Sequence, residues 1–469
     1  MPRTVSTQPN ILLIQCDQLR YDCSSSAVSS LIQIPSIDRL ASEGMRFTQA
    51  FTPIPLCCPA RQTLLCGKWA EVHGGLWNYD TCLPLRLFDE VTWTEALADR
   101  EYALGYVGKW HVHPEKTPLD FGFSTWISEQ DYHRWRQTEG LPTYWVESEH
   151  SHARWQGGYD PVELAQTKTH WYAGHAVELL SHYAQAGTPW HMRLDFEEPH
   201  LPCFPAEPFA RMYPPETIPP WGSVGEEFVN KPFMQQQQLV NWEVEQLSWS
   251  TWARYISRYL GMTSQIDDAI GRVLRALDAT GQEDQTIVIL TSDHGDACGG
   301  HRMVDKHYIM YEDVVHVPLV IRWPRVIELG TLCHELVLNA LDLPPTICQA
   351  VGLPVPPSYQ GRSLMPLLHG QAPDGWRQEV VSTYNGNQFG LYTQRMLRDR
   401  RFKYVWNATD LDELYDLQED PWELRNLVGD RCYDSLIQNM RVRLLAQLQS
   451  NGDAMVANSW IASQLAGYS

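Results

Sequence analysis

The sequence lacks any apolar run long enough to cross a membrane. Its longest unbroken apolar stretches, residues 11–14 and 287–290, are strand-sized, far below the ~20 residues that a bilayer requires. The N-terminus carries no apolar h-region or cleavage site, so we expect no secretory leader and a cytoplasmic protein without a membrane partner. The 11 cysteines are odd in number and irregularly spaced, which argues against a disulfide framework.

Basic side chains are also scarce. The chain has 36 Lys and Arg against 56 Asp and Glu, a net charge of −20, which excludes nucleic acid as the expected partner because phosphate binding needs clustered cations. We find no internal repeat. With 469 residues, 43% apolar and 20% charged, the chain is an ordinary globular protein long enough for one large and one small domain.

Four short apolar runs each end in polar residues that can do chemistry. Unalternating runs of this length are typical of strands covered on both faces, as in parallel sheets. Segments 36–43, 173–184 and 252–277 have apolar residues at helical spacing between them. Strands alternating with helices indicate an α/β sheet, on which ligands bind beyond the carboxyl ends of the strands. The runs 11–15, 102–107, 191–196 and 286–290 lead into Asp17-Gln18, Gly108-Lys109-Trp110-His111, Glu197-Glu198-Pro199-His200 and Asp293-His294-Gly295.

The composition turns rich in proline, glycine and polar residues around 354–357 and 370–376, as at a domain boundary. We therefore divide the chain into a catalytic α/β domain, 1–370, and a small α+β subdomain, 371–469. The fold class expected is a large, mixed, mostly parallel sheet sandwiched by helices, followed by a smaller antiparallel sheet with a helix. The short strands expected in the second part are 379–383, 391–398, 402–407 and 413–417, and the helix is 430–449.

Residues 125–160 are irregular and dense in tryptophan, tyrosine and histidine. One interpretation is a surface excursion packed by its own aromatic side chains, and the other is a lid or substrate wall over the crevice. The tail 451–469 also allows two interpretations. It is either a packed terminus or an element that joins the subunits of a homo-oligomer.

The most informative stretch is 51–68. Pro59 suits the first position of a helix and Gly67 suits its end, which places Cys57 at the helix N-terminus. Free N–H groups and the helix dipole favour anions there. Arg61, one turn on, can return over the same end and hold a tetrahedral oxyanion with its fork of donors.

Cys57-x-Pro59-x-Arg61 followed by Gly67 resembles the signature of the type I sulfatases, members of the alkaline phosphatase superfamily. The resemblance implies an alkaline phosphatase-like fold. It also implies that a maturation enzyme oxidises Cys57 to Cα-formylglycine, whose hydrate is the nucleophile. The other segments fall in the family's order: Asp17-Gln18 and Asp293-His294-Gly295 as metal segments, Lys109 and His111 as the Lys/His pair, His200 at the leaving group, and Lys306 as the last active-site lysine.

The family chemistry assigns roles to these positions. Cys57, as formylglycine hydrate, attacks sulfur, while Arg61 and Lys109 hold sulfate oxygens. His200 with Lys306 protonates the departing alcohol, and His111 then takes the proton whose loss releases sulfate. As substrate contacts we expect Lys109, His200, Lys306, Asn78 and His301, although His301 also fits a satisfied polar residue.

A divalent metal is implied beside Cys57. Its carboxylate and amide ligands favour a hard ion, Ca²⁺ first, with Mg²⁺ or Mn²⁺ open. The expected metal site consists of Asp17, Gln18, Asp293, His294 and the modified Cys57. Many sulfatases have an Asp and an Asn where this chain has Gln18 and His294. The Gln and His variant is similar to choline sulfatases and phosphonate monoester hydrolases.

The leading hypothesis is thus a sulfuric ester hydrolase acting on an alkyl, aryl or carbohydrate sulfate. Phosphonate monoester or phosphodiester hydrolysis with the same nucleophile is the alternative, and the Lys109/His111 pair favours sulfate over it. A catalytically inactive binding protein on this fold is a third hypothesis, against which the retained charged residues argue.

Overall fold

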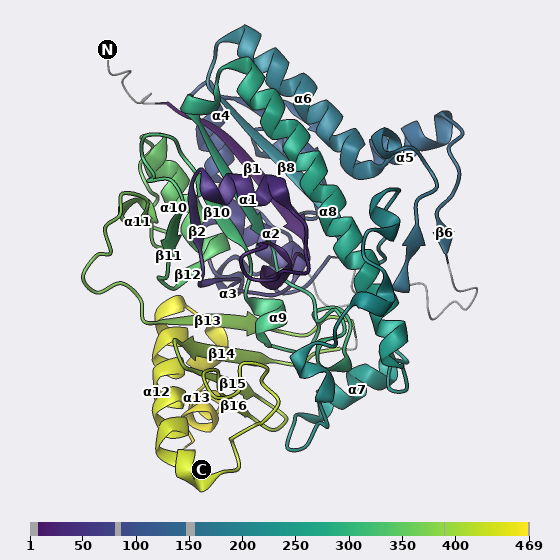
Figure 1. The fold of residues 1–469 in the computed structure, drawn as a ribbon. Coiled ribbons are helices and arrows are strands. Elements are labelled where there is room, and N and C mark those ends of the chain that lie inside the picture. Colours follow the sequence, from purple (N-terminus) through teal and green to yellow (C-terminus); the bar gives the residue numbers. More distant parts are fainter. Residues whose placement is uncertain (1–7, 80–85, 147–154, 389, 468–469) are drawn as a thin grey trace.

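The large sheet of the computed structural model has eight strands, in the order β11-β2-β10-β9-β1-β8-β4-β5 (Figure 1). Its centre is parallel, since β1 pairs with β8 and β9 in the same direction, whereas β10 runs antiparallel to β9 and β2. The structure describes residues 8–79, 86–146, 155–388 and 390–467. The strands are β1 Asn10–Asp17, β2 Met45–Phe47, β4 Ala103–Gly108, β5 Thr125–Ile127, β8 Trp190–Pro199, β9 Thr286–Ser292, β10 Leu319–Arg322 and β11 Thr331–Cys333.

Two helical layers cover this sheet. On one face α1, α6 and α8 pack on side chains such as Leu12, Ile14 and Leu194, and α6 and α8 run side by side in Figure 1. On the other face α2, α4, α10 and α11 pack on Ile11 and Leu13. Neighbouring residues of β1 thus serve opposite faces, which explains why the run does not alternate with polar residues. The helices are α1 Pro35–Ser42, α2 Cys57–Cys66, α4 Trp93–Ala98, α6 Lys168–Ala186, α8 Trp249–Thr280, α10 Asn339–Ala350 and α11 Met365–Leu368.

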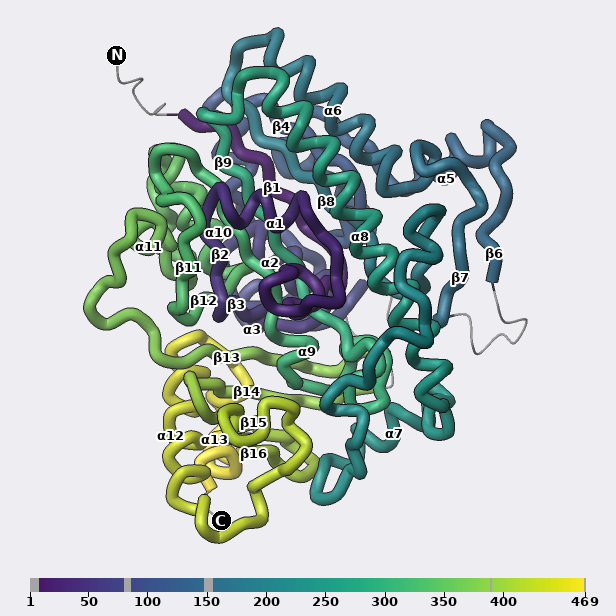
Figure 2. Tube along the Cα trace, in the orientation of Figure 1, coloured from purple at the N-terminus to yellow at the C-terminus, as the bar shows by residue number. Residues whose placement is uncertain are grey.

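A second, four-stranded antiparallel sheet follows, with α12 packed on it through Met440, Leu444 and Leu448. In the tube view it forms a separate layer at the end of the molecule that carries the C-terminus (Figure 2). The fold class is as expected, a mixed and mostly parallel sheet between helices plus a small antiparallel sheet. The division at 370/371 stays a prediction. The elements are β13 Glu379–Tyr384, β14 Gln394–Asp399, β15 Phe402–Asn407, β16 Glu413–Asp416, α12 Asp434–Asn451 and α13 Ser459–Ala466.

The aromatic segment 125–160 is more regular than expected. It contains helix α5, which begins after Ser128 because the Ser128 hydroxyl and the Asp131 carboxylate cap each other's backbone N–H groups. Residues 147–154, with two of its histidines, lie outside the described ranges. The remaining short elements of the chain are β3 Ala50–Phe51, α3 Ala70–His73, α5 Glu129–Thr138, β6 Trp145–Val146, β7 Gly158–Tyr159, α7 Phe233–Asn241, α9 Glu312–Val315 and β12 Val337–Leu338.

Within the described ranges, no helix combines the length and the apolar character needed to span a bilayer. The ten cysteines described are all free, and Cys82 lies outside those ranges.

Candidate active site

The carboxyl ends of β1 and β9 bring two acidic segments together. Asp17 ends β1, and Asp293 and His294 directly follow β9, its parallel neighbour. The Nε2 atom of His294 lies 3.6 Å from Oδ1 of Asp17 and 3.8 Å from Oδ1 of Asp293. These three side chains are buried. Strand ends that are 276 residues apart in the chain therefore form one wall of a site.

Helix α2 places Cys57 against this wall. Its Sγ lies 3.2 Å from Nε2 of His294 and 3.6 Å from Oδ1 of Asp17. The helix begins at Cys57, so Pro59 is its third residue and not the first as the sequence suggested. The missing N–H of Pro59 still costs nothing, because the first turn has no intrahelical acceptors. Gly67 ends the helix with φ 65°, as expected.

Burial and the nearby Asp17 raise the pKa of the Cys57 thiol to about 12. A thiolate, which is the nucleophilic form, is therefore scarce at neutral pH. As an unmodified cysteine, this residue is a weak nucleophile.

Arg61 is the centre of an ion-pair network under the helix. Its Nε donates to Oδ2 of Asp293 at 3.0 Å, its Nη2 to Oδ2 of Asp17 at 3.2 Å, and its Nη1 to Oδ2 of Asp195 at 2.9 Å. Asp195 on β8 also accepts from Arg193 and from the hydroxyl of Tyr106. Asp195 was not among the predicted site residues, because nothing in the sequence of β8 indicates its distant partner Arg61.

Lys109 and His111 follow the end of β4, and Lys109 contacts Asp17. The Nζ atom of Lys109 lies 2.6 Å from Oδ2 of Asp17. Burial opposes ionisation of Asp17, but Lys109, His200 and Arg61 outweigh it and hold its pKa well below the usual range. Burial and Lys109 push the pKa of His111 well below its usual value, so this imidazole is neutral. Its Nδ1 is buried and has no hydrogen-bond partner among the described residues.

Lys306 and His200 contact each other next to Gln18. The Nζ atom of Lys306 lies 3.1 Å from Nε2 of His200 and donates to Oε1 of Gln18 at 3.0 Å. The carbonyl of Leu201 lies 2.6 Å from Nδ1 of His200, so we assign the proton of the neutral imidazole to Nδ1. Burial and Lys306 lower the pKa of His200 to about 4, which agrees with a neutral ring that accepts from Lys306.

Lys306 is backed by a chain of contacts that reaches the small sheet. Its Nζ lies 3.1 Å from Oδ1 of Asp305, whose Oδ2 lies 3.1 Å from Nε2 of His307. The hydroxyl of Tyr384, on β13, is 3.0 Å from Nδ1 of His307. The sequence placed His307 near Lys306, but nothing in it connected Tyr384 to this end of the site.

Four side chains offer atoms to a cation. One atom each of Asp17, Cys57, Asp293 and His294 lie within 4.8 Å of one another. The Nδ1 of His294 is held by the carbonyl of Gly295 at 2.8 Å, which leaves Nε2 facing the group. Two carboxylates and an imidazole suit a divalent ion. Gln18 differs, because its amide contacts Lys306, Asp296 and Asp305, and its place as a ligand stays a prediction.

Two expected substrate contacts have other partners in the structure. Asn78 accepts from the backbone N–H of Cys58 at 3.0 Å and so caps α2. His301 is buried, pairs with Glu226 at 2.9 Å and stacks on Tyr311 at 3.6 Å between ring centroids. Their roles toward substrate stay predictions.

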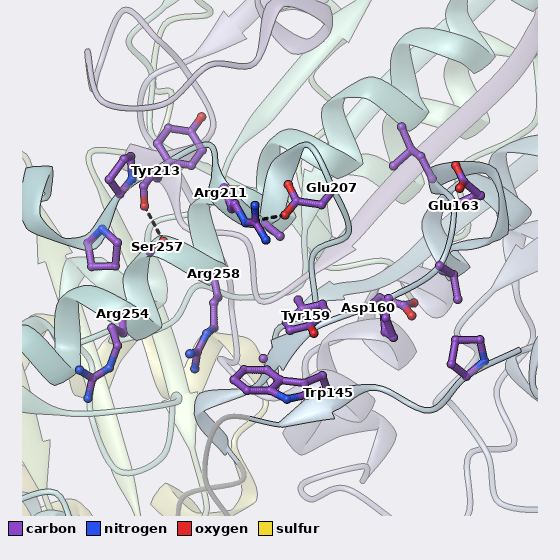
Figure 3. Close-up of a pocket in the computed structure, with 18 of the residues that line it drawn as sticks. Trp145, Tyr159, Asp160, Glu163, Glu207, Arg211, Tyr213, Arg254, Ser257 and Arg258 are labelled. Atoms are coloured by element: carbon purple, nitrogen blue, oxygen red, sulfur yellow. Dashed lines mark hydrogen bonds and ion pairs between the residues drawn. The ribbon is translucent and has the colours of Figure 1, made fainter.

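A chamber of about 150 Å³ adjoins His200. Lys168, Glu197 and Glu198 line it with Tyr144 of the aromatic segment, and a substrate wall there stays a prediction. Asp160 also lines a larger neighbouring hollow of about 960 Å³. Figure 3 shows this hollow, where Trp145 and Tyr159 lie together and Arg258 of α8 points toward them.

Comparison with known proteins agrees with this geometry. The model of the Sulfatase family matches residues 9–353, and the model described as N-sulphoglucosamine sulphohydrolase, C-terminal, matches 299–450. An arylsulfatase of Clostridium perfringens is 26% identical, over 94% of this chain and 95% of its own. An N-acetylglucosamine-6-O-sulfatase of Bacteroides thetaiotaomicron is 26% identical, over 91% of this chain and 84% of its own. The solved phosphonate monoester hydrolase of Silicibacter pomeroyi superposes with a TM-score of 0.82, at 23% identity and over 96% and 97% of the two chains.

The family match over residues 9–353 thus defines a hydrolase of the alkaline phosphatase superfamily. Within that class the chain belongs to the sulfatase family, and it is a sulfatase, an enzyme that hydrolyses sulfate esters.

Proposed function

We propose that the enzyme uses Cys57, converted to formylglycine by a maturation enzyme, as the nucleophile that cleaves a sulfate monoester. The observation that carries this proposal is the position of Cys57, within 3.2 Å of His294 and 3.6 Å of Asp17 at the start of α2. An oxidised and hydrated residue at this position supplies two hydroxyl groups, one to attack sulfur and one whose deprotonation frees sulfate. The high pKa of the thiol supports the need for such a modification.

The residues around Cys57 would stabilise negative charge and transfer protons. Arg61 and Lys109 are cations that neutralise sulfate oxygens, where negative charge accumulates as the ester bond breaks. The ammonium of Lys306, which donates to the neutral His200, is the source of the proton that this pair delivers to the departing oxygen. His111 is neutral, and its buried Nδ1 has no partner among the residues that the structure describes, so it is suited to accept the proton whose loss releases sulfate.

Asp17, Asp293 and His294, together with Gln18, would hold a divalent metal, and we propose Ca²⁺. The bound metal would polarise the sulfuryl group and acidify the nucleophile. Carboxylate and amide oxygens favour a hard ion, and Ca²⁺ tolerates an irregular ligand set better than Mg²⁺ does.

The substrate proposed is a small-molecule or carbohydrate sulfate, in line with the two sulfatases most of whose length this chain matches. Phosphonate monoester hydrolysis is the second candidate, because a phosphonate monoester hydrolase shares the fold. Parallel kinetics on 4-nitrophenyl sulfate and phenylphosphonate monoesters separate the two. We expect the higher kcat/KM on the sulfate, and a clear preference for the phosphonate would overturn this choice.

A mass spectrum of the peptide that contains Cys57 tests the nucleophile. We expect an aldehyde in place of the thiol in active protein, and loss of turnover in Cys57→Ala. Active protein whose Cys57 is entirely an unmodified thiol would contradict the proposal.

We further propose a cytoplasmic enzyme, which the ten free cysteines support, since a reducing compartment keeps thiols unpaired. A homo-oligomer remains a proposal that light scattering tests.

A further inference from the structure

We propose that the chamber beside His200 selects an alcohol that carries a hydrogen-bond donor, a hydroxyl or an ammonium group, next to the ester oxygen. This inference rests on the proposed function, because it concerns the alcohol half of the sulfate ester. It adds a specificity-determining residue, Glu198.

The position of the chamber makes it the entry for the alcohol. His200, assigned to the departing oxygen, lines the chamber, and so do Glu197 and Glu198 near the end of β8, which stops at Pro199 directly before His200. A volume of about 150 Å³ admits a small group and not a polymer. Whatever occupies the chamber is therefore the part of the alcohol closest to the bond that breaks.

The charges in its walls do not cancel. Lys168 contacts Oε2 of Glu197 and lies 3.3 Å from Oε1 of Glu198. It also lies 3.9 Å from Glu129, so one ammonium is shared by three carboxylates, two of which line the chamber. Asp160, the third acid, is neutralised by Arg136, which lies 2.7 Å from one of its oxygens and 2.8 Å from the other. No further cation of the described residues lines the chamber, which leaves one negative charge in excess beside His200.

Glu198 is the acceptor that lacks a donor. Its Oε2 is buried and has no hydrogen-bond partner in the described part of the chain, while its Oε1 is shared with Lys168. A buried carboxylate oxygen left unpaired costs free energy that a donor from a ligand would recover. A hydroxyl or ammonium group supplies such a donor, whereas a second sulfate or a carboxylate would meet the excess negative charge.

A series of alkyl sulfates of matched size tests this inference. The esters are 2-aminoethyl, 2-hydroxyethyl, propyl and carboxymethyl sulfate, and kcat/KM is measured for each with the mature enzyme. We expect both donor-bearing esters to exceed propyl sulfate by roughly tenfold or more, as for hydrogen bonds to a charged group. Carboxymethyl sulfate is expected to be the poorest. Equal values for the first three esters would overturn the proposal.

The variant Glu198→Gln tests whether the preference for donor-bearing esters depends on Glu198. It removes the excess charge, so the ratio of kcat/KM for 2-aminoethyl over propyl sulfate should fall by roughly tenfold. The matched control is Glu178→Gln on α6, whose side chain is 74% exposed, and it should keep the wild-type ratio. An unchanged ratio in Glu198→Gln would also overturn the proposal.

Inhibition gives a second readout that needs no turnover of the alkyl esters. Each ester competes against 4-nitrophenyl sulfate, and the inhibition constants should follow the same order. If matured protein hydrolyses neither 4-nitrophenyl sulfate nor any of the four alkyl esters, the proposed function fails. If 4-nitrophenyl sulfate is hydrolysed and the four esters bind alike, only the present inference fails.

Discussion

Asp195 on β8 accepts a hydrogen bond from Arg61 on α2 at 2.9 Å, across 134 residues of sequence. Both side chains are fully buried. Asp195 thereby fixes a cation that we assign to the sulfate, although its own partners are Arg61, Arg193 and Tyr106 and not the nucleophile.

Asp195→Asn should therefore weaken both stability and catalysis. The substitution leaves two buried guanidinium groups short of a negative charge, and breaking such a pair costs about 3–5 kcal/mol. Urea unfolding measures this loss. The control is Asp278→Asn, which breaks the half-exposed pair with Arg39 and should cost less than about 1 kcal/mol. Equal losses in the two variants would contradict the role given to Asp195.

His200→Ala should lower kcat/KM most for esters whose leaving oxygen needs a proton. We expect kcat/KM to fall by about 10²- to 10⁴-fold for alkyl sulfates. The fall should be smaller for 4-nitrophenyl sulfate, because nitrophenolate leaves readily without a proton. Kinetics over a series of leaving groups measure the difference, with His175→Ala on α6 as the control. A uniform fall across the series would argue for a structural effect.

Removal of the metal should lower thermal stability as well as activity. The buried carboxylates of Asp17 and Asp293 lie close together, and a cation that binds only the folded state stabilises it by mass action. We expect a chelator to lower the melting midpoint and Ca²⁺ to restore it better than Mg²⁺ or Mn²⁺. Asp17→Asn should abolish the response, while Asp268→Asn, at a 47% exposed side chain, should keep it. A response to Mn²⁺ alone would refute the choice of Ca²⁺.

Asp267 on α8 predicts a pH dependence of stability away from the active site. Burial raises its pKa to about 6, although the N–H groups of Ser36 and Ile37 at the start of α1 partly offset this. The folded protein thus binds the proton more tightly than the unfolded chain does. The stabilising proton is fully present below pH ~4 and is lost as the pH rises to ~6, at a cost of up to about 3 kcal/mol.

The measurement is urea unfolding of the wild type and of Asp267→Asn between these pH values. The variant lacks the titration, so its free energy of unfolding should fall less than that of the wild type over this range. Parallel pH profiles would show that Asp267 titrates alike in both states.

Sequence patterns predicted most of the fold, because β1 and β9 are buried on both faces and are mostly apolar. Strand β8 is a buried run that also contains Arg193 and Asp195. The same reasoning located Asp17 and Asp293, since ligands bind beyond the carboxyl ends of parallel strands. Cys57 was placed beside them by the resemblance of its motif to the sulfatase signature. Asp195 was missed because a charged residue inside such a run gives no sign of its distant partner. Helix α5 was missed because capping by Ser128 and Asp131, and not apolar periodicity, starts it.

The hydrogen bond between Tyr384 and His307 has a consequence for the architecture of the enzyme. It ties the leaving-group lysine, through His307 and Asp305, to the first strand of the small sheet. A truncated protein that keeps all eight strands of the large sheet but stops before β13 would still contain every residue assigned to catalysis. We expect it to lose the support behind Lys306, so the C-terminal layer is part of the catalytic apparatus and not a detachable appendage.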